Sequence, residues 1–115
     1  MALFQGKNLT SSNLVLHLDA TNTKSYSGSG NTWYDLSGFG NNGTLNNGVL
    51  YNSYGGFFEF DGSNDYIEIP HASSLNIGTG TSATIEIIYD AYNYVPNASL
   101  IAKRSADNNS STDYM

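Results

Sequence analysis

The 115-residue sequence contains no cysteine, only two prolines and only four basic residues against ten acidic ones. Without cysteine, neither a disulfide framework nor a thiolate metal site can hold the fold together. So few lysines and arginines leave no basic patch, and we therefore expect no binding to nucleic acid. A run of about 18 apolar residues is also missing, so we expect no insertion into a membrane.

The polar surface must be largely uncharged, because only 12% of the residues carry a charge while glycine, asparagine, serine and threonine are abundant. These small polar residues disfavour long helices and supply turns. Nine tyrosines and five phenylalanines, together with many aliphatic residues, argue against disorder. The composition therefore predicts one small folded domain that is rich in turns.

The central stretch of the sequence predicts two strands and a turn. Residues 57–61 and 66–69 each alternate with a period of two, with Phe58 and Ile67 on the predicted buried faces. The residues between them, 62–64, are Gly-Ser-Asn and favour a turn. We predict a β-hairpin here, at the centre of an all-β sandwich.

The same pattern predicts further short strands along the chain. Alternation is clearest over residues 13–19 and 84–90. Shorter extended pieces are predicted at residues 32–36, 44–45, 49–51 and 99–104. Asn46-Asn47-Gly48 signals a second hairpin, between residues 44–45 and 49–51. With no helical segment, these strands and turns predict an all-β antiparallel sandwich or barrel.

The order of the motifs is more specific than the composition. It runs Leu14-Val-Leu-His-Leu-Asp-Ala, Thr32-Trp-Tyr-Asp-Leu-Ser-Gly, Asn41-Asn-Gly-Thr-Leu, Phe60-Asp-Gly-Ser-Asn-Asp-Tyr-Ile and Ala83-Thr-Ile-Glu. This order resembles the laminin-G-like, concanavalin A-like jelly roll, in its pentraxin-related branch. The resemblance implies an antiparallel β-sandwich over residues 13–115, after a lead-in segment of residues 1–12. Full modules of this family are longer, so we expect an incomplete sandwich, the N-terminal portion of one.

Calcium is the metal that the sequence favours, because Asp, Asn and backbone oxygens on loops are its usual ligands. Residues 61–65 and 107–109 supply such oxygens. In pentraxin-like members, an Asp-Asn pair just after a strand like residues 99–104 binds calcium. The resemblance therefore implies calcium ligands at Asp107 and Asn108, and the alternative is that these residues form ordinary Asx turns.

Glycan binding is the second activity that the resemblance implies, because this fold binds sugars through aromatic rings beside Asn and Asp on loops. Trp33, Tyr92 and Tyr94 lie near predicted turns and are the candidate glycan contacts. The alternative is that Trp33 belongs to the core and the tyrosines are half-buried, since such rings combine packing with a polar group.

Catalysis is not expected. Glu86 and Asp90 share a strand face, but four residues of strand place them about 13 Å apart. Glycosidases need their two carboxylates about 5–9.5 Å apart. Neither His17 nor His71 has a second ligand at zinc-binding spacing. We therefore expect a non-enzymatic protein.

This chain opens with a methionine close to the first predicted strand, and in this it resembles modules of bacteriophage structural and tail proteins. The resemblance implies a virion structural or adhesion module, such as a capsid decoration or tail fibre protein. Its expected partners are other virion chains, in a homo-oligomer or another symmetric assembly, and surface glycans. The alternative is a calcium-dependent carbohydrate-binding module of a larger extracellular protein, and a glucan hydrolase fragment ranks below both.

Overall fold

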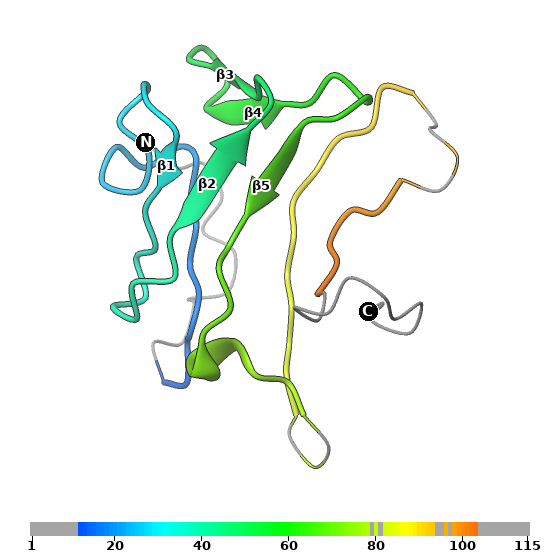
Figure 1. Ribbon diagram of the computed structural model, residues 1–115. Helices are drawn as coiled ribbons and strands as arrows, with labels where there is room; N and C mark the ends of the chain where they lie inside the picture. Colours follow the sequence, from blue (N-terminus) through cyan, green and yellow to red (C-terminus); the bar gives the residue numbers. More distant parts are fainter. Residues whose placement is uncertain (1–11, 79, 81, 94–95, 97, 104–115) are drawn as a thin grey trace. The chain divides into compact units, whose positions relative to one another are not determined.

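The computed structural model describes residues 12–78, 80, 82–93, 96 and 98–103. The chain divides into two compact units, residues 1–85 and 86–115. Among the described residues, every assigned strand lies in the first unit (Figure 1). Five short strands and a single short 3-10 helix are assigned there, so the protein is mainly β, as the sequence predicts.

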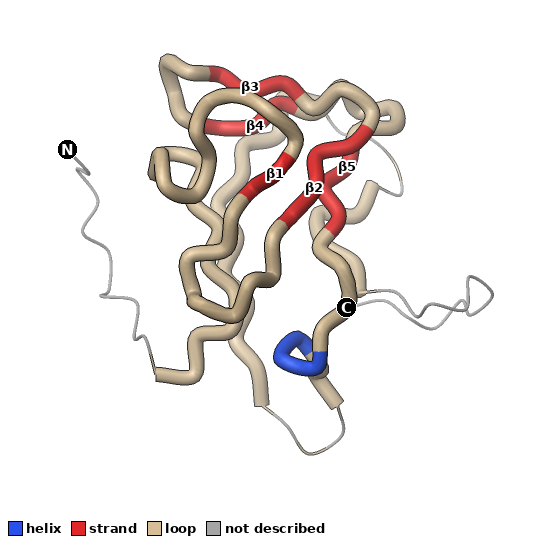
Figure 2. Tube along the Cα trace, turned by 60° about the vertical axis from the view of Figure 1, so that its left-hand side comes forward, coloured by secondary structure: helices blue, strands red, loops and turns tan. Residues whose placement is uncertain are grey.

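The strands of the first unit form two small antiparallel sheets (Figures 1 and 2). The three-stranded sheet has the order β1-β2-β5, with the bounds Thr32–Trp33, Gly43–Asn46 and Tyr66–Glu68. The two-stranded sheet pairs β3 with β4, with the bounds Leu50–Asn52 and Phe57–Glu59. In register, Leu45 lies opposite Ile67 and Tyr51 lies opposite Phe58.

Both predicted hairpins are wrong in their pairing, although their arms form strands. The arms at residues 57–61 and 66–69 contain β4 and β5, which belong to different sheets. The strands on either side of Asn46-Asn47-Gly48, β2 and β3, are also split between the sheets. The observed pairs are nested instead, because β3 and β4 form an inner hairpin while β2 and β5 form the outer pair.

The inner hairpin is closed by the side chain of Asn52. Its Oδ1 atom accepts hydrogen bonds from the N–H groups of Tyr54 and Gly55, at 3.1 Å each. The N–H of Gly56 also donates to the Asn52 carbonyl at 2.8 Å. Gly56 has a φ of 69°, a conformation that glycine adopts without strain. These four residues therefore provide the turn that sends β4 back along β3.

Aromatic side chains join the two sheets. Trp33 of β1 meets Phe58 of β4 with ring centroids 4.7 Å apart. Tyr26 packs on Tyr51 and Phe58, at 4.7 and 4.8 Å. Tyr26 and Leu45 are the most buried hydrophobic residues described, at 4% and 7% exposure. Such tilted and edge-on ring pairs stabilise by about 0.5–1.5 kcal/mol beyond their area burial.

No strand is assigned over residues 13–19, which differs from the prediction. Several backbone groups there bind side chains, and the His17 carbonyl accepts the Leu36 N–H at 2.8 Å without forming a ladder. The N–H of His17 donates to Asp35 Oδ1 at 2.9 Å, and the Val15 carbonyl accepts from Asn41 Nδ2 at 2.7 Å. The apolar alternation is therefore present in the sequence without the ladder that defines a strand.

The predicted strands at residues 84–90 and 99–104 also differ from the structure. No strand is assigned over 84–90 or over 99–103, where the described residues end. After Pro70 the chain forms the 3-10 helix η1, Ser73–Leu75. Within the described ranges no helix is long and apolar enough to cross a membrane.

Candidate functional site

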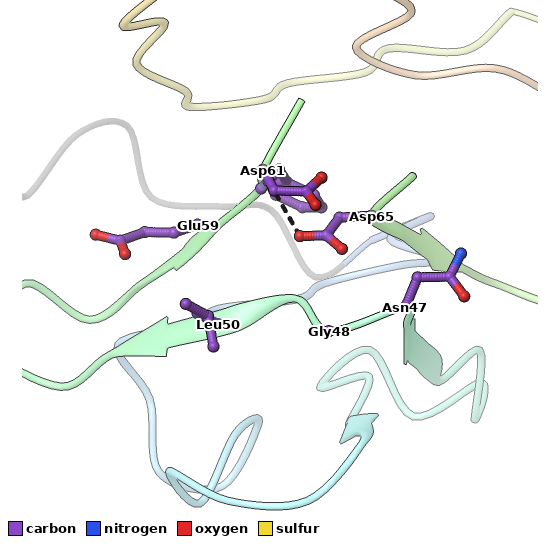
Figure 3. A pocket seen from close by; sticks show the side chains of 7 residues that line it. Asn47, Gly48, Leu50, Glu59, Asp61 and Asp65 are labelled. Atoms are coloured by element: carbon purple, nitrogen blue, oxygen red, sulfur yellow. Dashed lines mark hydrogen bonds between the residues drawn. The ribbon is translucent and has the colours of Figure 1, made fainter. Parts of the chain in front are cut away.

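The candidate site is a cavity of about 390 Å³ in the first unit (Figure 3). Two loops form it, the β2–β3 turn and the β4–β5 connection. Its lining residues are Asn47, Gly48, Leu50, Glu59, Phe60, Asp61 and Asp65. This volume lies within the range of pockets that bind small ligands.

The β2–β3 turn contributes one wall of the cavity. Asn47 and Gly48 have φ values of 65° and 106°, both in the left-handed region. Asn-Gly is the residue pair that such tight turns favour. The Asn47 side chain donates from Nδ2 to the Asn64 carbonyl at 2.7 Å, which ties the turn to the β4–β5 connection.

The β4–β5 connection is shaped by Asp61. Its Oδ1 atom accepts hydrogen bonds from the N–H groups of Ser63 and Asn64, at 2.8 and 3.3 Å. Gly62, which lies between Asp61 and Ser63, has a φ of 74°. The hydrogen bond from Ser63 is the main reason why the pKa of Asp61 lies below its ordinary value. Asp61 therefore carries a negative charge at neutral pH.

Asp65 brings a second carboxylate to the same connection. Its Oδ2 atom accepts a hydrogen bond from the Asp61 N–H at 3.0 Å, drawn as a dashed line in Figure 3. Its Oδ1 atom is buried and has no hydrogen-bond partner within the part of the chain that the structure describes. A buried oxygen without a partner is energetically costly.

Apolar side chains line the cavity beside these carboxylates. Phe60 and Leu50 are 52% and 65% exposed, so both side chains reach solvent at the cavity. A solvent-exposed aromatic ring next to hydrogen-bond acceptors provides both an apolar surface and polar contacts. This combination suits a ligand that has hydroxyl groups on an apolar ring.

The carboxylates of Asp61 and Asp65 lie together at the cavity, and Glu59 does not join them. Within the described ranges, no three His, Cys, Asp or Glu side chains come together as metal ligands. Figure 3 shows why, because Glu59 points away from the neighbouring Asp61 and Asp65. Calcium needs six to eight oxygen ligands, so the residues present do not fit it. The predicted ligands Asp107 and Asn108 lie outside the described residues.

The predicted glycan contacts come from different parts of the chain. The Trp33 ring is half-buried against Phe58, and its Nε1 atom is buried without a partner. Tyr92 belongs to the second unit and is 89% exposed. Tyr94 lies outside the described residues. The glycan contacts of these three residues stay a prediction.

Sequence reasoning found one part of the candidate site and missed the other. It identified residues 61–65 as an oxygen-rich loop, but it did not place Asn47, Leu50 or Phe60 beside this loop. One signal was present, because Phe60 immediately precedes Asp61 and an aromatic ring therefore adjoins the acidic turn. The approach of Asn47 follows from the nested strand pairing, which the sequence did not predict.

Comparison of this chain with models of known protein families, with curated protein sequences and with solved structures finds no match.

Proposed function

We propose that this chain is a non-enzymatic glycan-binding and structural module of a virion. One observation carries the binding part of the proposal. The exposed ring of Phe60 and the acidic residues Asp61 and Asp65 line the same cavity of about 390 Å³. An apolar ring beside carboxylates suits a sugar ligand.

A sugar ring would use the cavity in a simple way. Its C–H groups would pack on the Phe60 ring, and one hydroxyl would donate a hydrogen bond to the Asp65 carboxylate. Asp61 adds a second negative acceptor, since its pKa lies below the ordinary value through the hydrogen bond from Ser63. This division between apolar and polar contacts is typical of small-molecule sites.

The nested strands support a jelly roll as the architecture of this module. A jelly roll arises when a long hairpin folds over, so that its inner and outer strand pairs lie in different sheets. Here the inner pair, β3 and β4, forms one sheet, and the outer pair, β2 and β5, lies in the other. The incomplete antiparallel sandwich implied by the laminin-G-like resemblance has this property.

The virion location rests on the same sequence resemblance, to modules of bacteriophage structural and tail proteins. A net charge of −6 without a basic patch suits an exposed protein that avoids nucleic acid. The proposed partners are other virion chains in a symmetric assembly, with the chain serving as a capsid decoration or tail fibre protein. Copurification of the chain with assembled particles is the expected result, and its absence from purified particles would refute this location.

Titration with a panel of oligosaccharides tests the binding site. Phe60→Ala should weaken the binding of the best ligand about tenfold, because ring contacts of this kind contribute about 1 kcal/mol or more. Phe39→Ala is the matched control, since Phe39 is 58% exposed and does not line the cavity. Equal losses in the two variants, or no binding to any sugar in the panel, would contradict the proposal.

The same titration distinguishes this proposal from its alternative, which is a calcium-dependent carbohydrate-binding module of a larger extracellular protein. Binding through Phe60 and Asp65 needs no metal, so a chelator should leave the affinity unchanged. Loss of binding on chelation, restored by added calcium, would favour the alternative, in which Asp107 and Asn108 are ligands.

A further inference from the structure

Two asparagine-glycine pairs occur in nearly the same local sequence, and the fold places them differently. The first is Asn41-Asn42-Gly43-Thr44 and the second is Asn46-Asn47-Gly48-Val49. Each has an asparagine before the pair and a β-branched residue after it. A difference in reactivity between the two therefore reports the structure rather than the sequence.

We propose that Asn47 is a site of spontaneous deamidation and that the fold protects Asn42 from the same reaction. In this reaction the backbone nitrogen of the following glycine loses its proton to base and attacks the side-chain carbonyl carbon of the asparagine. A carbon–nitrogen bond forms, and the side-chain nitrogen leaves as ammonia. Water then opens the cyclic imide at either carbonyl, which gives aspartate or isoaspartate.

The surroundings of Asn47 leave this reaction open. Both Asn47 and Gly48 are exposed. The Gly48 N–H forms no hydrogen bond among the described residues, so its nitrogen can rotate toward the Asn47 side chain without breaking one. Crowding is also low, because a β-carbon added at Gly48 would have Asp65 Oδ1 as its nearest neighbour, at 3.9 Å.

The surroundings of Asn42 oppose the same rotation. Gly43 is a buried residue of β2 opposite Trp33, and a β-carbon there would lie 3.0 Å from Ile67 Cγ2. The Asn42 side chain accepts the Asp35 N–H at 2.9 Å, and the Asn47 side chain also forms one hydrogen bond, to the Asn64 carbonyl at 2.7 Å. The two sites therefore differ in the following glycine, which is packed in β2 at Gly43 and exposed at Gly48. Asn42 can therefore react only after β2 opens locally.

Deamidation at Asn47 would change the cavity. The nitrogen that leaves is the Nδ2 atom that donates to the Asn64 carbonyl, so the tie between the two loops is lost. The carboxylate that replaces it joins Asp61 and Asp65 on the cavity wall. Repulsion among these negative charges would loosen the β4–β5 connection.

The test is a time course on the full chain in mildly alkaline buffer, followed by protease digestion and mass spectrometry of the peptides that hold each asparagine. In the folded protein, Asn47 should convert at least about tenfold faster than Asn42, which corresponds to local opening of β2 by about 1.4 kcal/mol. The matched control is the same chain in concentrated urea, where the two asparagines should convert at similar rates.

Three outcomes would overturn the proposal. Equal conversion of the two asparagines in the folded protein would mean that β2 does not protect Asn42. Faster conversion at Asn42 would reverse the assignment. Conversion of both residues in urea but of neither in the folded protein would mean that the β2–β3 turn holds Asn47 as firmly as the sheet holds Asn42.

Discussion

Among single residues, Asp35 joins segments on both sides of β1. Its carboxylate accepts hydrogen bonds from the N–H groups of His17, Ser37 and Asn41 and from the Ser37 hydroxyl, at 2.7–3.0 Å. Burial acts to raise the pKa of Asp35, but these hydrogen bonds outweigh it and hold the pKa below the ordinary value. The charged form therefore organises the loop that follows β1.

Replacing Asp35 by Asn should destabilise the protein by about 1.5–3 kcal/mol, the usual contribution of hydrogen bonds to a charged group. An amide can accept at only one of its two positions, so its NH₂ group would face a donor, the N–H of Asn41. Urea unfolding measures the change as a shift in midpoint at constant slope. Asp90→Asn is the control, because Asp90 is exposed without a described hydrogen bond.

The same variant gives a prediction about pH. Since the pKa of folded Asp35 is lowered, its contribution to stability is present above the unfolded pKa and is lost as the pH falls through the folded pKa. The wild-type protein should therefore lose stability as the pH falls below about 4, and Asp35→Asn should lose less over that interval. Parallel pH profiles of the two proteins would contradict this role for Asp35.

Among the strands, β2 depends on the absence of a side chain at Gly43. A β-carbon there would lie 3.0 Å from Ile67 Cγ2 and 3.6 Å from Trp33 Cβ. Gly43→Ala should therefore destabilise the protein by about 1–3 kcal/mol through overpacking. Gly78→Ala is the matched control, since an added β-carbon there has no atom within 4 Å. A similar unfolding midpoint for the two variants would contradict this, because it would mean that β2 and β5 can move apart without lowering the free energy of unfolding.

The sequence located the strands of the first unit better than it paired them. Alternation and turn residues predicted extended segments close to β1, β2, β3, β4 and β5. The pairing failed because the signal at Asn47-Gly48 is local and fits a turn within one sheet as well as a turn between sheets. Packing of Trp33 on Phe58 joins the two sheets, and no local pattern contains that contact.

The candidate site was predictable only in part for a similar reason. Residues 61–65 carry their own signal, because Asp, Gly, Ser and Asn together favour a loop with exposed oxygens. The other wall, at Asn47 and Gly48, comes from a segment 17 positions earlier, joined by the hydrogen bond from Asn47 to Asn64. That contact depends on the register of β2 against β5, which sequence periodicity does not fix.

At the scale of the whole molecule, backbone hydrogen bonding differs between two described segments. The N–H groups of Tyr34 and Leu45 donate to backbone carbonyls at 2.7 and 2.8 Å. Residues 86–90 of the second unit form no hydrogen bond among those described. Backbone hydrogen bonding governs the exchange of amide protons with solvent.

Hydrogen exchange should therefore separate the two sets of amides. We expect the amides of Tyr34 and Leu45 to exchange much more slowly than those of Ile87 and Ile88, which should exchange at rates close to those of an unfolded peptide. Mass spectrometry or NMR at low protein concentration measures both sets in one experiment. Strong protection at Ile87 and Ile88 would contradict the expectation and show that residues 86–90 have a bonding partner.

The nested strands also bear on how the chain folds. The inner hairpin closes a loop of only four residues, 53–56, whereas β2 and β5 lie at the ends of a far longer stretch. Loop closure loses more entropy as the loop grows, and non-local contacts slow folding. Once β3 and β4 have paired, however, they bring the flanking ends of β2 and β5 close together. We therefore expect the strands to assemble from the inner pair outward, with the cavity between the loops completed only at the last step.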